Sequence, residues 1–211
     1  MIPPAYCERT TQGLLGEPLN VASNLVILAA AWAVWRLADH SSKSTPGVTM
    51  LVWLIVAIGL GSALFHMLAT GWALAFDAGP IFLFEIAFVW LYGRSMARLT
   101  APATILVLVA FLAALGLSSH FHRILNGSLS YAPSLVLLLA FAFVHHQVCL
   151  RERFALFFAW LSFAAAAAFR TVDLMLCPCV PCGTHFLWHV FTGVMLYLLM
   201  RGMIANMPER P

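Results

Sequence analysis

The sequence predicts an all-α membrane protein with seven transmembrane helices. Of its 211 residues, 63% are hydrophobic and only 9% are charged, a composition typical of chains that cross a bilayer several times. The sequence contains seven apolar segments, each close to the roughly 20 residues that a helix needs to span the hydrocarbon core. We therefore expect one domain built from seven helices.

These segments follow one another along most of the chain. Residues 1–19 are polar and too few for a domain, so we expect an N-terminal arm there, then the helical domain over 20–205 and a short tail over 206–211. The first apolar segment follows a stretch with proline and glutamate, so it is not expected to be a cleaved signal peptide. We expect the helices at residues 20–38, 48–69, 77–97, 101–118, 131–148, 152–173 and 184–205.

Basic residues predict the orientation of the helices. With seven spans, eight of the 11 Lys and Arg residues fall on the side of the C-terminus, and only Arg9, Arg123 and Arg170 fall on the other side. The positive-inside rule then places the N-terminus outside and the C-terminus in the cytoplasm. The net charge of +3 reflects this asymmetry and gives no reason to expect nucleic-acid binding.

Polar and ionisable side chains gather at the outer ends of three predicted helices. Ser62 and His66 lie four residues apart, so they share one helix face about 6 Å apart along the axis. Asp77 follows at the expected start of the third helix, and His185 and His189 repeat the four-residue spacing at the start of the last. Because of the alternating helix directions, we expect all three histidines at the same level of the membrane.

Three histidines at one level predict a metal site. Zinc binds neutral imidazole nitrogens, and three protein ligands leave a fourth position open, as in catalytic zinc sites. The ion lowers the pKa of bound water towards about 7. Asp77 would then transfer a proton and Ser62 would donate to an oxyanion, which indicates hydrolysis of an amide or ester. In the alternative, each histidine hydrogen-bonds a neighbouring helix and no metal binds.

The first helix adds polar residues to the same region. Asn20, Ser23 and Asn24 form a stripe at helical spacing that is expected to face neighbouring helices rather than lipid. Glu17, at the outer start of this helix, is expected at the same end. Glu85 lies two turns deeper than Asp77 on the third helix, so it needs a partner or a proton.

Several motifs combine around these residues. They are GLGSALFH with Asp77 eleven positions after His66, HFLWHVFTG with His185 and His189, EPLNVASN at the first helix and YCE in the arm. In these motifs the chain resembles the alkaline ceramidase family. The resemblance implies a seven-helix, zinc-dependent membrane amidase that splits ceramide into a sphingoid base and a fatty acid. It also implies that the three histidines bind zinc, with Ser62 at the oxyanion and Asp77 as the proton-transfer residue.

The resemblance implies two further features of the N-terminal arm. One is a calcium site, for which the sequence offers Glu8 and Glu17. Calcium takes six to eight oxygens, and the sequence departs from the family pattern around these two residues. The other is a disulfide between the arm and the loop after the sixth helix, which would join Cys7 to Cys177. The states of Cys179 and Cys182 stay open.

Two alternatives to a ceramidase remain at this point. One is a related seven-helix zinc hydrolase that acts on another lipid, either an ester or the substrate of an adiponectin-receptor-like amidase. The other is a receptor or proton-coupled transporter in which His66, Asp77 and Glu85 form a relay without a metal. In the hydrolase interpretation the partners are the membrane and a ceramide-like lipid substrate. The sequence does not specify the oligomeric state.

Overall fold

The computed structural model describes residues 6–11, 13–121 and 124–208, and this part of the chain contains helices and no strand. Seven segments are long and apolar enough to cross a membrane, which confirms the predicted helix count and an integral, multi-pass membrane protein. The elements in order are α1 (Pro18–Ser23), α2 (Leu25–His40), α3 (Pro46–Leu68), α4 (Gly71–Ser95), α5 (Ala101–Ser119), η1 (Ile124–Tyr131), α6 (Ala132–Val148), α7 (Ala155–Leu176) and α8 (His185–Asn206).

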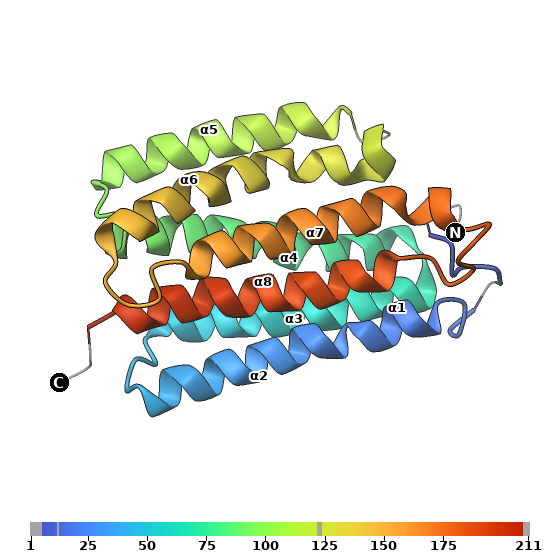
Figure 1. Cartoon of the computed structure of the whole chain (residues 1–211), viewed down its shortest axis with the longest axis horizontal. Helices are drawn as coiled ribbons and strands as arrows, with labels where there is room; N and C mark the ends of the chain where they lie inside the picture. The colour runs from blue at the N-terminus through green and yellow to red at the C-terminus, as the bar shows by residue number, and fades with distance from the viewer. Residues whose placement is uncertain (1–5, 12, 122–123, 209–211) are drawn as a thin grey trace.

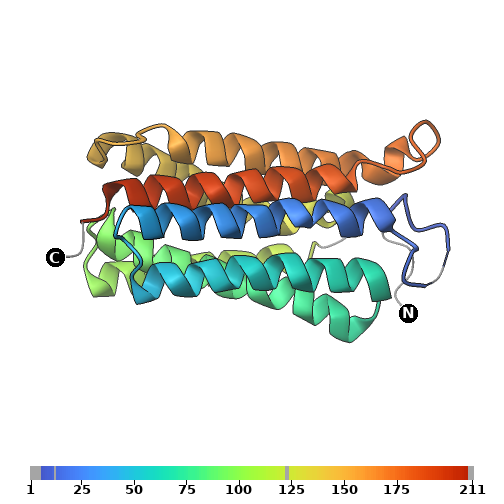
Figure 2. The same cartoon turned by 90° about the horizontal axis from the view of Figure 1, so that it is seen from below.

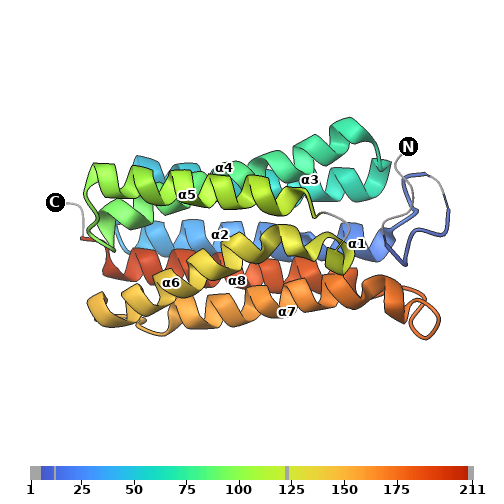
Figure 3. The same ribbon diagram turned by 90° about the horizontal axis from the view of Figure 1, so that it is seen from above.

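The helices form one elongated bundle around α8. Helix α8 is the most buried of the seven spans and α5 is the least. Figure 1 shows α8 between α7 and the pair α2 and α3. The views from below and from above place α3 and α4 on one side of α8 and α7 on the other (Figures 2 and 3). The end of α3 and the starts of α4 and α8 therefore meet at one end of the bundle, beside the N-terminal arm (Figure 1).

The third membrane span begins six residues earlier than the sequence predicted. Helix α3 ends at Ala69, which has a left-handed backbone with φ of 46°. Thr70 then caps α4 by accepting a hydrogen bond from the N–H of Ala73 at 3.4 Å. The segment after Gly71 has no proline before Pro80, and the helix continues through that residue to Ser95. Asp77 therefore lies inside α4, in its second turn, rather than at its start.

Glycine allows α3 and α4 to come into backbone contact at this end of the bundle. A Cβ atom at Gly61 would lie 2.0 Å from the carbonyl oxygen of Phe76 and 3.3 Å from the backbone nitrogen of Asp77. No larger residue fits there without moving a helix, as is common where membrane helices pack closely. This contact brings the backbone next to Ser62 against the backbone of Asp77.

Candidate functional site

The three predicted histidines converge in the structure. His66 comes from the last turn of α3, and His185 and His189 come from the first turns of α8. Their candidate ligand nitrogens all lie within 4.8 Å of one another, and each residue is only 1% exposed. Within the described ranges, they form the one group of three or more His, Cys, Asp or Glu side chains that could hold a metal ion.

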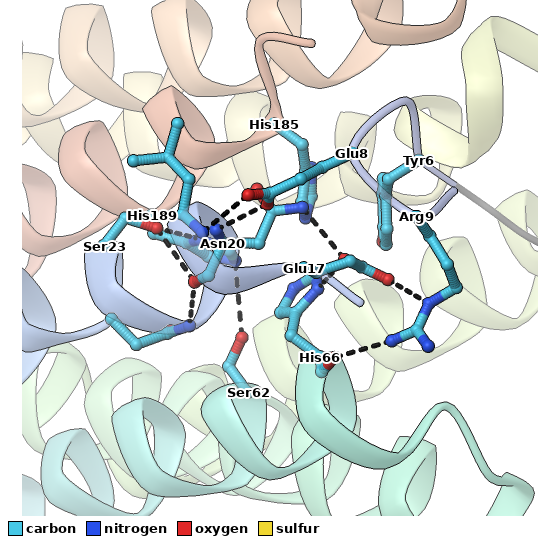
Figure 4. A network of polar contacts seen from close by, with 12 residues as sticks. Tyr6, Glu8, Arg9, Glu17, Asn20, Ser23, Ser62, His66, His185 and His189 are labelled. Atoms are coloured by element: carbon cyan, nitrogen blue, oxygen red, sulfur yellow. Dashed lines mark hydrogen bonds and ion pairs between the residues drawn. The ribbon is translucent and has the colours of Figure 1, made fainter. Parts of the chain in front are cut away.

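The surroundings of the three rings fit a bound metal ion. Nδ1 of His66 donates to the carboxylate of Glu17, and Nδ1 of His189 lies 2.7 Å from the hydroxyl oxygen of Ser23 (Figure 4). Such outer partners orient metal-ligating histidines in proteins. Nδ1 of His185 is buried and has no hydrogen-bond partner, which is costly unless another group compensates for it. The donor set is therefore suited to a divalent metal.

Ser62 and Asp77 line the same pocket as the three histidines. Ser62 is buried, and its hydroxyl oxygen lies 3.4 Å from Nε2 of His189. Figure 4 shows Ser62 one turn before His66 on α3, pointing towards the cluster. A hydroxyl and a carboxylate thus line the same small pocket as the candidate metal ligands.

The polar stripe of the first helix also faces this pocket. Ser23 contacts His189, and Asn20 donates from Nδ2 to Glu17 at 2.9 Å. Asn24 donates from Nδ2 to the carbonyl oxygen of Asn20 at 2.8 Å. These hydrogen bonds of Asn20 and Asn24 are local, whereas Ser23 makes the expected contact with another helix and orients a candidate metal ligand.

The N-terminal arm covers the histidine cluster at this end of the bundle. The ring of Tyr6 stacks on His185 with centroids 3.7 Å apart and lies 5.2 Å from His66. The predicted disulfide between Cys7 and Cys177 is present, with a Cα–Cα distance of 5.3 Å. Sequence analysis did not predict a role for Tyr6, although it immediately precedes a cysteine of this disulfide.

A buried carboxylate fastens the arm to the start of α8. Asp173 is fully buried in α7. Its Oδ2 accepts from the N–H of Cys7 at 3.0 Å, and its Oδ1 accepts from the N–H groups of Thr184 and His185 at 2.6 and 2.9 Å. Asp173 thereby satisfies two of the free N–H groups at the N-terminus of α8. Asp173 thus links the N-terminal arm to His185, the first candidate metal ligand on α8.

Glu17 connects the arm to the histidine cluster. Its carboxylate forms an ion pair with Arg9 and accepts from His66, and Arg9 also donates to the backbone carbonyl of His66 (Figure 4). Burial opposes ionisation of Glu17, but hydrogen bonds from His66, Asn20 and Arg9 together hold its pKa below the usual value. Glu17 therefore carries a negative charge beside the candidate metal ligands.

The two carboxylates implied as calcium ligands both contact donors from the protein. Glu8 accepts from the N–H groups of Leu19 and Asn20 at 2.6 and 2.8 Å, at the start of α1. Glu17 is engaged by the guanidinium of Arg9. The positive charge beside Glu17 thus comes from an arginine, and a calcium site in the arm stays a prediction.

An apolar cavity adjoins the histidine pocket inside the bundle. The two share Ile58, Ile81, Tyr131, Trp188 and Thr192 as walls. Phenylalanine and leucine side chains from five of the helices form most of the remaining wall. The cavity therefore extends from the histidines into the part of the bundle that lies between the membrane surfaces.

Glu85 is the ionisable side chain in this cavity wall, and it has the partner that its depth requires. The hydroxyl of Ser134, on α6, donates to its carboxylate. Glu85 thus lies on α4 about 12 Å further along the axis than Asp77, at the usual rise per residue. Glu85 and Ser134 thus form a polar contact in a cavity wall that is otherwise mostly apolar.

Two other functional candidates lie around the pocket and were not identified from the sequence. Arg170 of α7 lines it, and Arg9 of the arm contacts His66. For Arg170 a signal was available, since an arginine within an apolar span is rarely placed without a function. Arg9 carried no such signal, because charged residues are common in short polar arms.

Comparison with known proteins supports one family. A family model described as Ceramidase matches residues 5–207, which is nearly the whole chain. No match was found among curated proteins or among solved structures.

Proposed function

Because the chain belongs to the ceramidase family, we propose that it is a zinc-dependent hydrolase that splits the amide bond of ceramide or a related lipid amide. The products would be a sphingoid base and a fatty acid. One observation carries this proposal above the others: three buried histidines that could hold a metal face the same pocket as Ser62 and Asp77, next to an apolar cavity.

The choice of zinc follows from the chemistry of the donors. Three imidazole nitrogens without a thiolate or carboxylate ligand match the catalytic zinc sites that keep a position open for water or substrate. His66 and His189 have partners on Nδ1, so their Nε2 atoms would bind the metal, and the hydroxyl of Ser62 lies 3.4 Å from Nε2 of His189. When bound, zinc would supply an acidified water and polarise the substrate carbonyl.

The side chains of the pocket would perform the remaining steps. Asp77 accepts a proton from the attacking water and passes it to the amide nitrogen, so that the nitrogen leaves as an amine. Ser62 donates a hydrogen bond to the carbonyl oxygen as that atom gains negative charge. His66, His185 and His189 hold the metal throughout and exchange no proton.

The apolar cavity supports a lipid as substrate. Its walls are rich in phenylalanine and leucine side chains, and pockets lined by hydrophobic and aromatic side chains are suited to apolar ligands such as a hydrocarbon chain. A chain seated among Phe84, Phe88 and Leu196 would leave its amide near the histidines, because the cavity and the histidine pocket share walls. The receptor and transporter alternatives are less favoured, because this cavity is apolar apart from Glu85 and a few hydroxyl groups.

We also infer that the site faces the extracytoplasmic side, either periplasmic or lumenal. Eight of the 11 Lys and Arg residues fall at the opposite membrane surface when seven spans are assigned, and such an excess is typical of the cytoplasmic side. The disulfide between Cys7 and Cys177 lies at the same end as the histidines, and disulfides persist in oxidising compartments.

The test of the proposed function combines metal analysis with lipid hydrolysis. Purified protein should contain zinc and should hydrolyse ceramide faster than a matched ester lipid. Replacing His66, His185 or His189 by Ala should remove most of the zinc and the activity. Asp77→Asn should keep the zinc and lose roughly 10²- to 10⁴-fold in rate, and Ser62→Ala roughly 10²- to 10³-fold.

Two outcomes would contradict the assignment. Histidine variants that keep full zinc occupancy would show that these residues are not the ligands. Asp77 and Ser62 variants that hydrolyse ceramide and related amides and esters at the parent rate would contradict the hydrolase mechanism. Faster hydrolysis of the ester lipid would show that the substrate is an ester rather than an amide, and it would not contradict the proposed metal site.

A further inference from the structure

Arg170 lies in an aromatic enclosure beside the histidine cluster. Its guanidinium carbon is 5.5 Å from the ring centres of Tyr6 and Trp188 and 5.7 Å from that of Tyr131. Nη1 donates to the phenolic oxygen of Tyr6 at 2.7 Å. The side chain lines the pocket that also contains Asp77 and the histidines. A permanent positive charge therefore borders the proposed reaction site.

No carboxylate of the described residues lies within ion-pair distance of this charge. The ion pairs found among the described residues involve Glu17 and Glu152 as acids, and neither contacts Arg170. Nε of Arg170 is buried and has no hydrogen-bond partner. Asp77, which lines the same pocket, attracts this charge from beyond ion-pair distance, but it does not accept a hydrogen bond from Nε. A buried, charged group with an unpartnered N–H is unfavourable in a membrane protein, so this arrangement indicates a missing acceptor.

The surrounding rings compensate for only part of this charge. Aromatic faces attract a guanidinium through cation–π interaction, and they anchor the arm by way of Tyr6. They do not accept an in-plane hydrogen bond from Nε. Nε of Arg170 therefore still lacks an acceptor. The planar guanidinium of arginine is suited to carboxylates, which can accept two parallel hydrogen bonds from it.

We propose that Arg170 binds the carboxylate of the fatty acid released at this site. The proposal rests on the proposed function, since hydrolysis of a neutral lipid amide creates a carboxylate where none existed before. The product then brings the acceptor that Nε of Arg170 lacks, with its hydrocarbon chain in the adjoining apolar cavity. Fatty acids should therefore bind more tightly than neutral lipids of the same chain length.

The test measures binding rather than turnover. Palmitate and hexadecanol, which share a chain length, are titrated into the purified full-length protein after its metal has been removed with a chelator, so that a metal cannot hold the carboxylate. The parent protein should prefer palmitate by about tenfold to a hundredfold, the effect of a hydrogen bond to a charged group. Arg170→Gln should lose this preference, and Arg170→Lys should keep part of it.

A further variant separates charge from fold. Arg201→Gln removes an arginine that pairs with Glu152 at the other end of the bundle and should behave as the parent. The proposal is overturned if Arg170→Gln keeps the parent preference, or if the metal-free parent shows none. A protein that prefers palmitate but hydrolyses no lipid would contradict only the proposed function.

Discussion

Replacing Gly61 by Ala should separate catalysis from metal binding. Helices α3 and α8 provide all three histidines, whereas Asp77 comes from α4. Gly61 is the point at which α3 touches the backbone of α4, immediately before Asp77. An added methyl group there pushes Asp77 away from the histidines without acting on α8.

The size of the displacement follows from the contact distance. A Cβ atom at Gly61 would lie 2.0 Å from the carbonyl oxygen of Phe76, and ordinary contacts begin near 3.4 Å, so the helices must move apart by about 1.4 Å. A misplacement of about 1 Å can reduce an enzymatic rate roughly 10²-fold. Overpacking of this kind also destabilises a fold by about 1 to 3 kcal/mol, partly offset by the better helix propensity of alanine.

The assay compares Gly61→Ala with Gly79→Ala. Gly79 lies on α4 as well, but a Cβ atom there would have no neighbour within 4 Å. We expect Gly61→Ala to keep its metal and lose at least roughly 10²-fold in hydrolysis rate. Gly79→Ala should retain the parent rate. Parent-like activity and thermal stability in Gly61→Ala would refute the reasoning, because the backbone contact would then not position Asp77.

Two more predictions concern the surroundings and the sidedness of the site. Glu17→Gln removes the charge that orients His66 and pairs with Arg9, so metal affinity should fall roughly 10- to 100-fold, measured by competition with a chelator. Gly71→Cys places a thiol on an exposed position with open space around it. In a background without the two exposed free cysteines, an impermeant maleimide should label it from the extracytoplasmic side of intact cells or vesicles.

Each of these predictions has a matched control. Glu152→Gln also breaks an ion pair with an arginine, but at the far end of the bundle, and should leave metal affinity unchanged. Equal affinity in Glu17→Gln would show that Glu17 does not support the metal site. Asp39→Cys, at the opposite end of the first span, should react only after permeabilisation. The reverse labelling pattern would invert the proposed orientation.

Length, hydrophobicity and spacing were enough to predict the number of helices and the residues that gather at one end of the bundle. An apolar segment of sufficient length forms a membrane helix because its own backbone must satisfy every hydrogen bond in lipid. Alternating helix directions then place His66, His185 and His189 at one end. These conclusions depend on length, hydrophobicity and spacing, which are local properties of the chain.

Only the tertiary structure decided what surrounds those residues. The contact between Cys7 and Asp173, and that between Ser23 and His189, each join residues 166 positions apart. The open edge of Arg170 likewise depends on how three rings from different segments pack around it. Spacing along a helix specifies which face a side chain occupies, but partners from other segments are set by close packing of helices. That packing determines which buried nitrogens have no hydrogen-bond partner, as is the case for Nδ1 of His185 and Nε of Arg170.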